Sequence, residues 1–134
     1  MAEKKQNPTP TTVEKLLGAC NRAPGEQYLQ FKSWTDADGN PVVFRIRELS
    51  YDKVRELQDM NTGKDLAAAI ITAGVVEPNL RDERLQQACG AATPYEVVRK
   101  MLRAGELEDL QAAIEKLSGY RGSTLQIFAD IEKN

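Results

Sequence analysis

The chain has 134 residues, of which 41% are hydrophobic and 28% are charged, and its formal net charge is −2 at pH 7. This length and composition are typical of one folded domain and argue against wholesale disorder. The 18 basic residues are outnumbered by 20 acidic ones, so we do not expect the electrostatic attraction to phosphates that nucleic-acid binding requires.

The chain lacks histidine, and with it the usual general base at neutral pH and the commonest metal-binding side chain. Its two cysteines, Cys20 and Cys89, are single residues and form no metal-binding pair. A disulfide between them is one alternative. Because no export signal opens the chain, we expect instead two buried or half-buried thiols in a reducing cytosol. We predict no catalytic, metal-binding or cofactor-binding residues and no enzymatic activity.

The N-terminal segment is predicted to be a flexible tail followed by a short helix. Residues 1–10 are polar and contain two prolines, which is typical of a loose chain end. Thr11 and Glu14 then match the Ser/Thr-x-x-Glu capping box that begins a helix. One side of this helix carries Val13, Leu16, Leu17 and Cys20.

Alternating hydrophobicity over residues 28–34 and 42–49 predicts two β-strands. Between them, residues 35–41 have the composition of a turn, and Gly39 suits positive φ. The same segment resembles the start of a calcium-binding loop, but its glycine comes too early and Arg47 stands where that loop needs a glutamate. We therefore predict an antiparallel hairpin over about residues 27–49.

The two faces of this hairpin differ in their side chains. One face is apolar and is expected to point to the core. Tyr28, Lys32 and Trp34 share the other face and form either an aromatic binding surface or a layer buried by a helix, and we expect burial. Two strands alone are marginally stable, so helices must cover the sheet or a partner must extend it. The apolar face carries Leu29, Phe31, Val42, Phe44 and Ile46.

Helical periodicity begins at Ser50, which is expected to cap a helix that continues to about Met60. After a short break, Thr62 or Asp65 is expected to cap the next helix. Residues 66–71 are small and apolar, so this helix is predicted to be the most buried one.

The longest apolar run, residues 66–76, is interrupted by Thr72 and Gly74. It is much shorter than the ~20 residues of a membrane span, so no membrane segment is predicted. Gly74 is expected to end the helix in the left-handed conformation. Pro78 disfavours helix at the residue before it, so residues 75–80 are predicted to be an extended connector.

Two more helix starts follow in the chain. Asp82 is expected to cap a short helix that ends at Gly90. Thr93 and Glu96 form a second capping box, with Pro94 at the first helical position, where a missing N–H costs nothing.

Gly105 is expected to break the chain before a last amphipathic helix that Gly119 ends. Residues 121–134 are predicted to be a C-terminal arm, either helical or extended. The predicted fold class is α+β, an N-terminal antiparallel β-hairpin followed by a mainly α-helical part over residues 50–120, in one domain over residues 11–120. The last helix carries Leu107, Leu110, Ile114 and Leu117 at 3–4 spacing.

Several short motifs follow one another between residues 67 and 120. They are Val76-Glu77-Pro78-Asn79-Leu80, Leu85-Gln86, Gly90 with Ala92-Thr93-Pro94, Lys100-Met101-Leu102, Gly105-Glu106 and Leu117-Ser118-Gly119-Tyr120. Together these motifs resemble the XkdN-like group of phage tail assembly chaperones. At two places this chain departs from that group: Tyr95 replaces one residue of an acidic pair, and Arg103-Ala104 stands where proline is common. Both changes keep the helix cap and the break.

The resemblance implies a chaperone that keeps the long, helical tape measure protein soluble and helps recruit tail tube subunits around it. It implies a protein of the host bacterial cytoplasm that is absent from the mature virion, with no catalytic residue and no cofactor. The alternative is a structural tail component, a completion or connector protein retained in the particle. A small enzyme that uses carboxylates or lysine ranks behind both, because no paired site is present.

A chaperone of this kind must cover apolar helix faces of its partner, and amphipathic helices suit that task. We expect a partner to contact the groove beside Val97, Met101, Leu107 and Leu110, with plain core packing as the alternative for each residue. The open edge of the hairpin is expected to accept a strand or to support a homo-oligomer.

Overall fold

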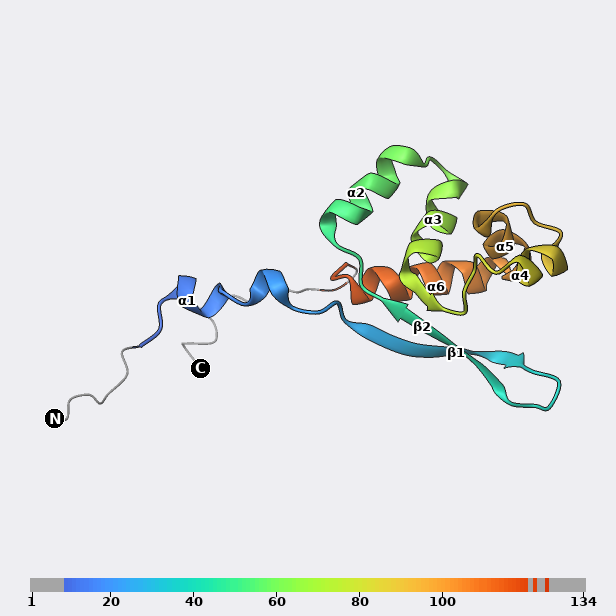
Figure 1. Cartoon of the computed structure of the whole chain (residues 1–134), viewed down its shortest axis with the longest axis horizontal. Helices are drawn as coiled ribbons and strands as arrows, with labels where there is room; N and C mark the ends of the chain where they lie inside the picture. Colours follow the sequence, from blue (N-terminus) through green and yellow to red (C-terminus); the bar gives the residue numbers. More distant parts are fainter. Residues whose placement is uncertain (1–8, 121, 123–124, 126–134) are drawn as a thin grey trace.

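The computed structural model describes residues 9–120, 122 and 125. An antiparallel sheet is followed by several helices, so the predicted α+β class is confirmed (Figure 1). The predicted tail over residues 1–10 and the C-terminal arm lie largely outside the described residues. In chain order the elements are α1 (Thr12–Leu16), the 3-10 helix η1 (Ala19–Asn21), β1 (Glu26–Thr35), β2 (Pro41–Arg47), α2 (Tyr51–Met60), α3 (Lys64–Gly74), β3 (Val75–Glu77), α4 (Glu83–Cys89), α5 (Pro94–Met101) and α6 (Ala104–Leu117).

The sheet has the strand order β1-β2-β3. The predicted hairpin is confirmed, because β1 pairs antiparallel with β2. The segment predicted as an extended connector supplies the third strand: β3 pairs antiparallel with β2 and places Glu77 opposite Arg45. Arg45 lies 3.2 Å from Glu26 of β1 and 3.6 Å from Glu77, which links all three strands. The outer edge of β1 has no strand neighbour within the described residues.

An irregularity in β1 changes the face on which Trp34 lies. The pairing shifts between Gln30, opposite Val43, and Thr35, opposite Pro41, so residues 31–34 stand opposite Val42 alone. The three extra residues in β1 are an odd number, so they reverse the alternation of the side chains beyond them. Trp34 therefore packs on Phe31 and Phe44 on the inner face, with ring centroids 5.2 and 5.7 Å away. Tyr28 stays exposed on the outer face, so the prediction that Tyr28 and Trp34 share a face is wrong.

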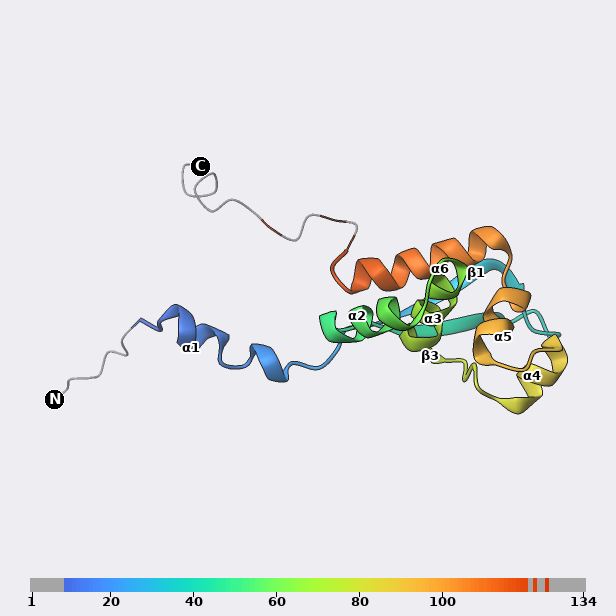
Figure 2. The same cartoon turned by 90° about the horizontal axis from the view of Figure 1, so that it is seen from above.

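The core lies between the inner face of the sheet and the helices above it (Figures 1 and 2). Phe44 and Ile46 of β2 are fully buried, as the alternation predicts. The prediction that α3 is the most buried helix agrees with four consecutive buried residues on it: Ala68, Ala69, Ile70 and Ile71.

Gly74, the last residue of α3, has a different role from the predicted one. Its φ is not positive, unlike that of Gly39 or Gly90. A Cβ at Gly74 would lie 2.7 Å from Cγ2 of Ile114 on α6, closer than two carbon atoms can pack. Gly74 therefore allows α3 and α6 to approach, and the predicted left-handed stop is wrong.

The predicted N-cap residues can be compared directly with the hydrogen bonds at the helix starts. The predicted caps at Thr11, Ser50, Asp82 and Thr93 are confirmed, each accepting a hydrogen bond from a backbone N–H of the first turn. At α3 the prediction fails, because the N-cap is Gly63, without a side-chain hydrogen bond.

The break before α6 is also displaced from its predicted place. It lies at Leu102 and Arg103, in extended backbone, and Gly105 belongs to the first turn of α6. Gly119, predicted to end this helix, directly follows its C-cap Ser118 and has a positive φ of 98°.

The chain from residue 9 to residue 24, called the arm below, projects from the rest of the structure. Both views show α1 well away from the sheet and from α2 to α6, which pack together as one body (Figures 1 and 2). Among the residues that the structure describes, no helix combines the length and apolar character needed to cross a bilayer.

Candidate protein-binding surfaces

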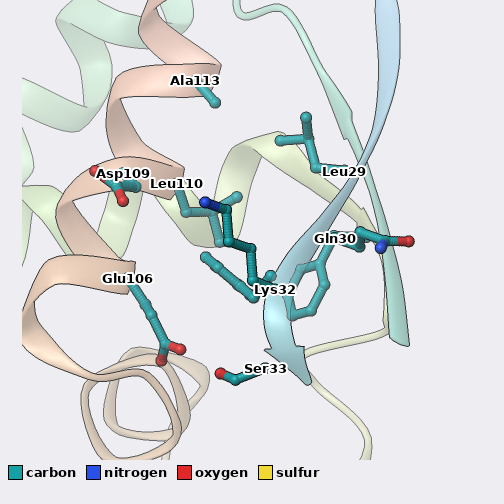
Figure 3. Close-up of a pocket in the computed structure, with 10 residues that line it drawn as sticks. Leu29, Gln30, Lys32, Ser33, Glu106, Asp109, Leu110 and Ala113 are labelled. Carbon is teal, nitrogen blue, oxygen red and sulfur yellow. The ribbon is translucent and has the colours of Figure 1, made fainter. Parts of the chain in front are cut away.

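A groove runs along the body between β1 and α6 (Figure 3). Its volume is about 520 Å³. Strand β1 forms one wall with residues 29–33, and α6 forms the other with Glu106, Asp109, Leu110 and Ala113. Most of the surface inside is apolar, which is typical of sites that take up hydrophobic side chains. The apolar lining comes from Leu29, Phe31, Phe44, Leu110 and Ala113.

Charged side chains stand at the rim of this groove. Lys32 extends from β1 toward α6, while Glu106 and Asp109 lie on the α6 side (Figure 3). The indole N–H of Trp34 donates a hydrogen bond of 2.9 Å to Glu106, and the backbone N–H of Arg103 donates another of 2.8 Å. These two bonds fix Glu106 and tie β1 to the start of α6. The groove thus combines an apolar floor with positioned charges.

Of the four residues predicted to contact a partner, two are buried and two are half-buried in the structure. Val97 is 0% exposed and Leu110 is 2% exposed, so both belong to the core. Met101 and Leu107 are half-buried and pack against that core. Of the four, Leu110 alone lines the groove. The 3–4 spacing that indicates a binding face also indicates a face packed on neighbouring helices, and Val97 and Leu110 are packed in this way.

The arm carries a second apolar surface, one that the sequence places on one side of a helix. Val13 is 68% exposed, Leu16 is 59% exposed and Leu17 is 68% exposed. Thr11 and Glu14 close the capping box around this helix: the backbone N–H of Glu14 donates to the Thr11 hydroxyl at 3.2 Å, and the Thr11 N–H donates to the Glu14 carboxylate at 2.7 Å. The helix is therefore capped locally while its apolar side stays open to solvent.

Glu48 holds the base of the arm against the body. Arg22 donates two hydrogen bonds to its carboxylate, at 2.6 and 3.3 Å, and the backbone N–H of Gly25 donates a third at 2.7 Å. The Glu48 N–H also donates to the Gly25 carbonyl at 2.9 Å. The hydrogen bonds from Arg22 and then from the Gly25 N–H lower the pKa of the Glu48 carboxyl.

Asp36, in the segment that resembles the start of a calcium-binding loop, has structural partners in the turn. Asp36 accepts hydrogen bonds from the backbone N–H groups of Asp38 and Asn40, as expected of a turn. These bonds lower the pKa of Asp36.

Both cysteines are free, with Cys89 half-buried and Cys20 exposed on the arm, which corrects the prediction of burial for Cys20. Within residues 9–120, no three acidic, cysteine or histidine side chains gather to hold a metal ion.

One solved structure shares the fold of this chain, and one family model matches most of its sequence. The crystal structure of the protein YqbN is similar, with a TM-score of 0.63 over 72% of this chain and 87% of YqbN, at 24% sequence identity. This likeness shows the fold alone. No curated protein matches the sequence.

The family model described as phage XkdN-like tail assembly chaperone protein matches residues 13–131. The match begins inside α1 and spans the hairpin, the groove and every later helix. The chain therefore belongs to the XkdN-like family of phage tail assembly chaperones.

Proposed function

We propose that the protein binds the tape measure protein during tail assembly and takes up an apolar helix face of it in the groove between β1 and α6. The observation that carries the proposal is this groove, with its apolar lining and charged rim on the surface of a chaperone-family protein. The tape measure protein is the client, and tail tube subunits are recruited around the complex.

Binding of a helix in a groove explains why an apolar surface is useful to a chaperone. An amphipathic helix buries its hydrophobic side chains in such a groove and keeps its polar face in water. Lys32 on one wall and Asp109 on the other give the groove opposite charges across its width. This favours a client helix that carries charges of the opposite sign at the matching positions. The chaperone family indicates a non-enzymatic role, and we place the protein in the host cytoplasm.

A co-purification experiment with the cognate tape measure protein tests the groove. Ala113 is half-buried on its floor, so Ala113→Glu places a carboxylate among apolar side chains. We expect at least a tenfold loss of captured tape measure protein. Ala104→Glu makes the same change at an exposed position of the same helix, and it should capture as much as wild type.

The contrary result is equal capture by Ala113→Glu when circular dichroism shows it folded, and this result discards the groove. Mass spectrometry of purified tails addresses the structural alternative. The chaperone should be missing from them, whereas stoichiometric retention identifies a completion or connector protein.

A further inference from the structure

We infer that the arm of one copy binds in the β1–α6 groove of a second copy, so that the chaperone self-associates head to tail through helix α1. The inference concerns this chain alone and does not depend on the identity of the client. It rests on an exposed helix, a groove of fitting chemistry, and their opposite charges.

Helix α1 has the marks of a binding element. It has five residues, far fewer than an isolated helix needs to be stable in water. Even so, its capping box is complete, and the family match begins at Val13. The helix thus belongs to the part of the chain that the family model covers, although the body leaves its apolar side exposed. A partner that covers this side supplies the missing stabilisation.

The apolar side of α1 has the spacing of a helix that docks in a groove. Val13, Leu16 and Leu17 stand at positions i, i+3 and i+4, which places them side by side on one face. The groove offers an apolar floor on which these three side chains can pack. The exposed Glu14 on the arm carries a charge opposite to that of Lys32 on the groove wall.

The geometry of the arm favours a second copy over its own body. Glu48 holds Arg22 and Gly25 at the N-terminal end of β1, whereas the groove lies farther along that strand, at residues 29–33. From this anchor, α1 points away from the body in both views (Figures 1 and 2). Contact between an arm and a different patch on the next molecule is heterologous, and it builds chains or closed rings.

The charges of the two surfaces are complementary. The arm carries Glu14 and Lys15 beside its apolar side, while its remaining charged residue, Arg22, is paired with Glu48 of the body. On the α6 side of the groove stand Glu106 and Asp109. Attraction between exposed charges falls as salt screens it, so self-association should weaken with ionic strength.

Two variants and their mixture test the inference, with the molar mass of the full chain measured by analytical ultracentrifugation. Leu16→Asp combined with Leu17→Asp disables the arm at exposed positions, and Ala113→Glu blocks the groove. Each variant alone should be monomeric where wild type associates. An equimolar mixture should form a dimer, because the arm of the groove variant enters the intact groove of the arm variant.

Two further variants distinguish the contact between arm and groove from other modes of self-association. Tyr51→Asp changes an exposed residue of α2 and should associate like wild type. Asp109→Arg reverses a charge at the exposed rim and should weaken association at least tenfold, which provides a second groove variant if Ala113→Glu fails to fold.

Three results overturn the inference. The first is a wild type that stays monomeric at all concentrations, which includes the case of an arm bound to its own body. The second is a mixture that remains monomeric. The third is self-association that survives in both variants, which points to the β1 edge instead. Equal capture of the tape measure protein by wild type and by folded Ala113→Glu, without any of these three results, contradicts the proposed function alone.

Discussion

Gly74 lies where α3 meets α6, and the space for a side chain there is already filled by Ile114. Gly74→Ala places a methyl group 2.7 Å from Cγ2 of Ile114, so the helices must move apart. We expect a loss of about 1–3 kcal/mol in the free energy of unfolding, the usual cost of overpacking. Urea denaturation measures this loss.

Gly18→Ala is the matched control, because a Cβ there meets nothing within 4 Å. Combining Gly74→Ala with Ile114→Ala should cost less than the sum of the single changes, since the second removes the clashing atoms. Strict additivity would show that the contact between Gly74 and Ile114 does not control how closely the helices approach.

Glu48 makes the attachment of the arm depend on pH. Its folded-state pKa is lowered from the ordinary value of 4.5 by Arg22 and by the Gly25 N–H. The ionised carboxylate therefore adds stability above pH 4.5, and this contribution is lost as the pH falls through the lowered folded-state pKa. Compared with Glu48→Gln, wild type should be more stable at pH 7, with the difference fading on acidification below pH 4.5.

Urea unfolding of both proteins across this pH range measures the difference. If the difference is constant over the whole range, ionisation of Glu48 plays no part in holding the arm.

At the scale of elements, the contact between β1 and α6 depends on Glu106. Glu106→Ala removes the acceptor for the Trp34 indole N–H and for the Arg103 N–H. We expect a loss of about 1–3 kcal/mol in the free energy of unfolding, because both donors lose their partner. The chain contains one tryptophan, so the emission of Trp34 reports the same contact.

Glu108→Ala serves as the control, since Glu108 is exposed on the same helix. Unchanged Trp34 emission and unchanged stability in Glu106→Ala would contradict a structural role for this pair.

Local chemistry made some elements predictable and left others hidden. The caps at Thr11, Ser50, Asp82 and Thr93 were predictable because a cap and its N–H lie within three residues of each other. The pairing of β3 with β2 joins residues about thirty positions apart, and no local pattern encodes it. The shift in β1 that turns Trp34 inward likewise depends on the partner strand.

The candidate binding surfaces were harder to predict from the sequence than the fold was. Apolar positions at 3–4 spacing marked both α1 and α6, but spacing alone does not tell which face the body covers. The structure resolves this difference: Leu110 is buried in the core, while Leu16 of α1 is exposed. The groove itself arises from the separation of β1 and α6, which is a tertiary property. The family was recognisable from motif order, because that order needs no tertiary knowledge.

At the scale of the whole molecule, the body carries an apolar groove at its side and an arm with an apolar helix at one end (Figures 1 and 2). Both surfaces suit contact with helices. If the arm fills the groove of a neighbour, it competes there with the tape measure protein. Self-association then keeps the apolar groove covered until a client arrives.

Hydrogen–deuterium exchange tests the binding of a client in the groove most directly. The arm variant with Leu16→Asp and Leu17→Asp keeps its groove empty, so its exchange is compared with and without the tape measure protein. Binding should slow exchange at residues 29–33 and 106–113, which line the groove, and leave α2 unchanged. Slower exchange confined to α2 or to other parts of the body, with residues 29–33 and 106–113 unaffected, would contradict the account.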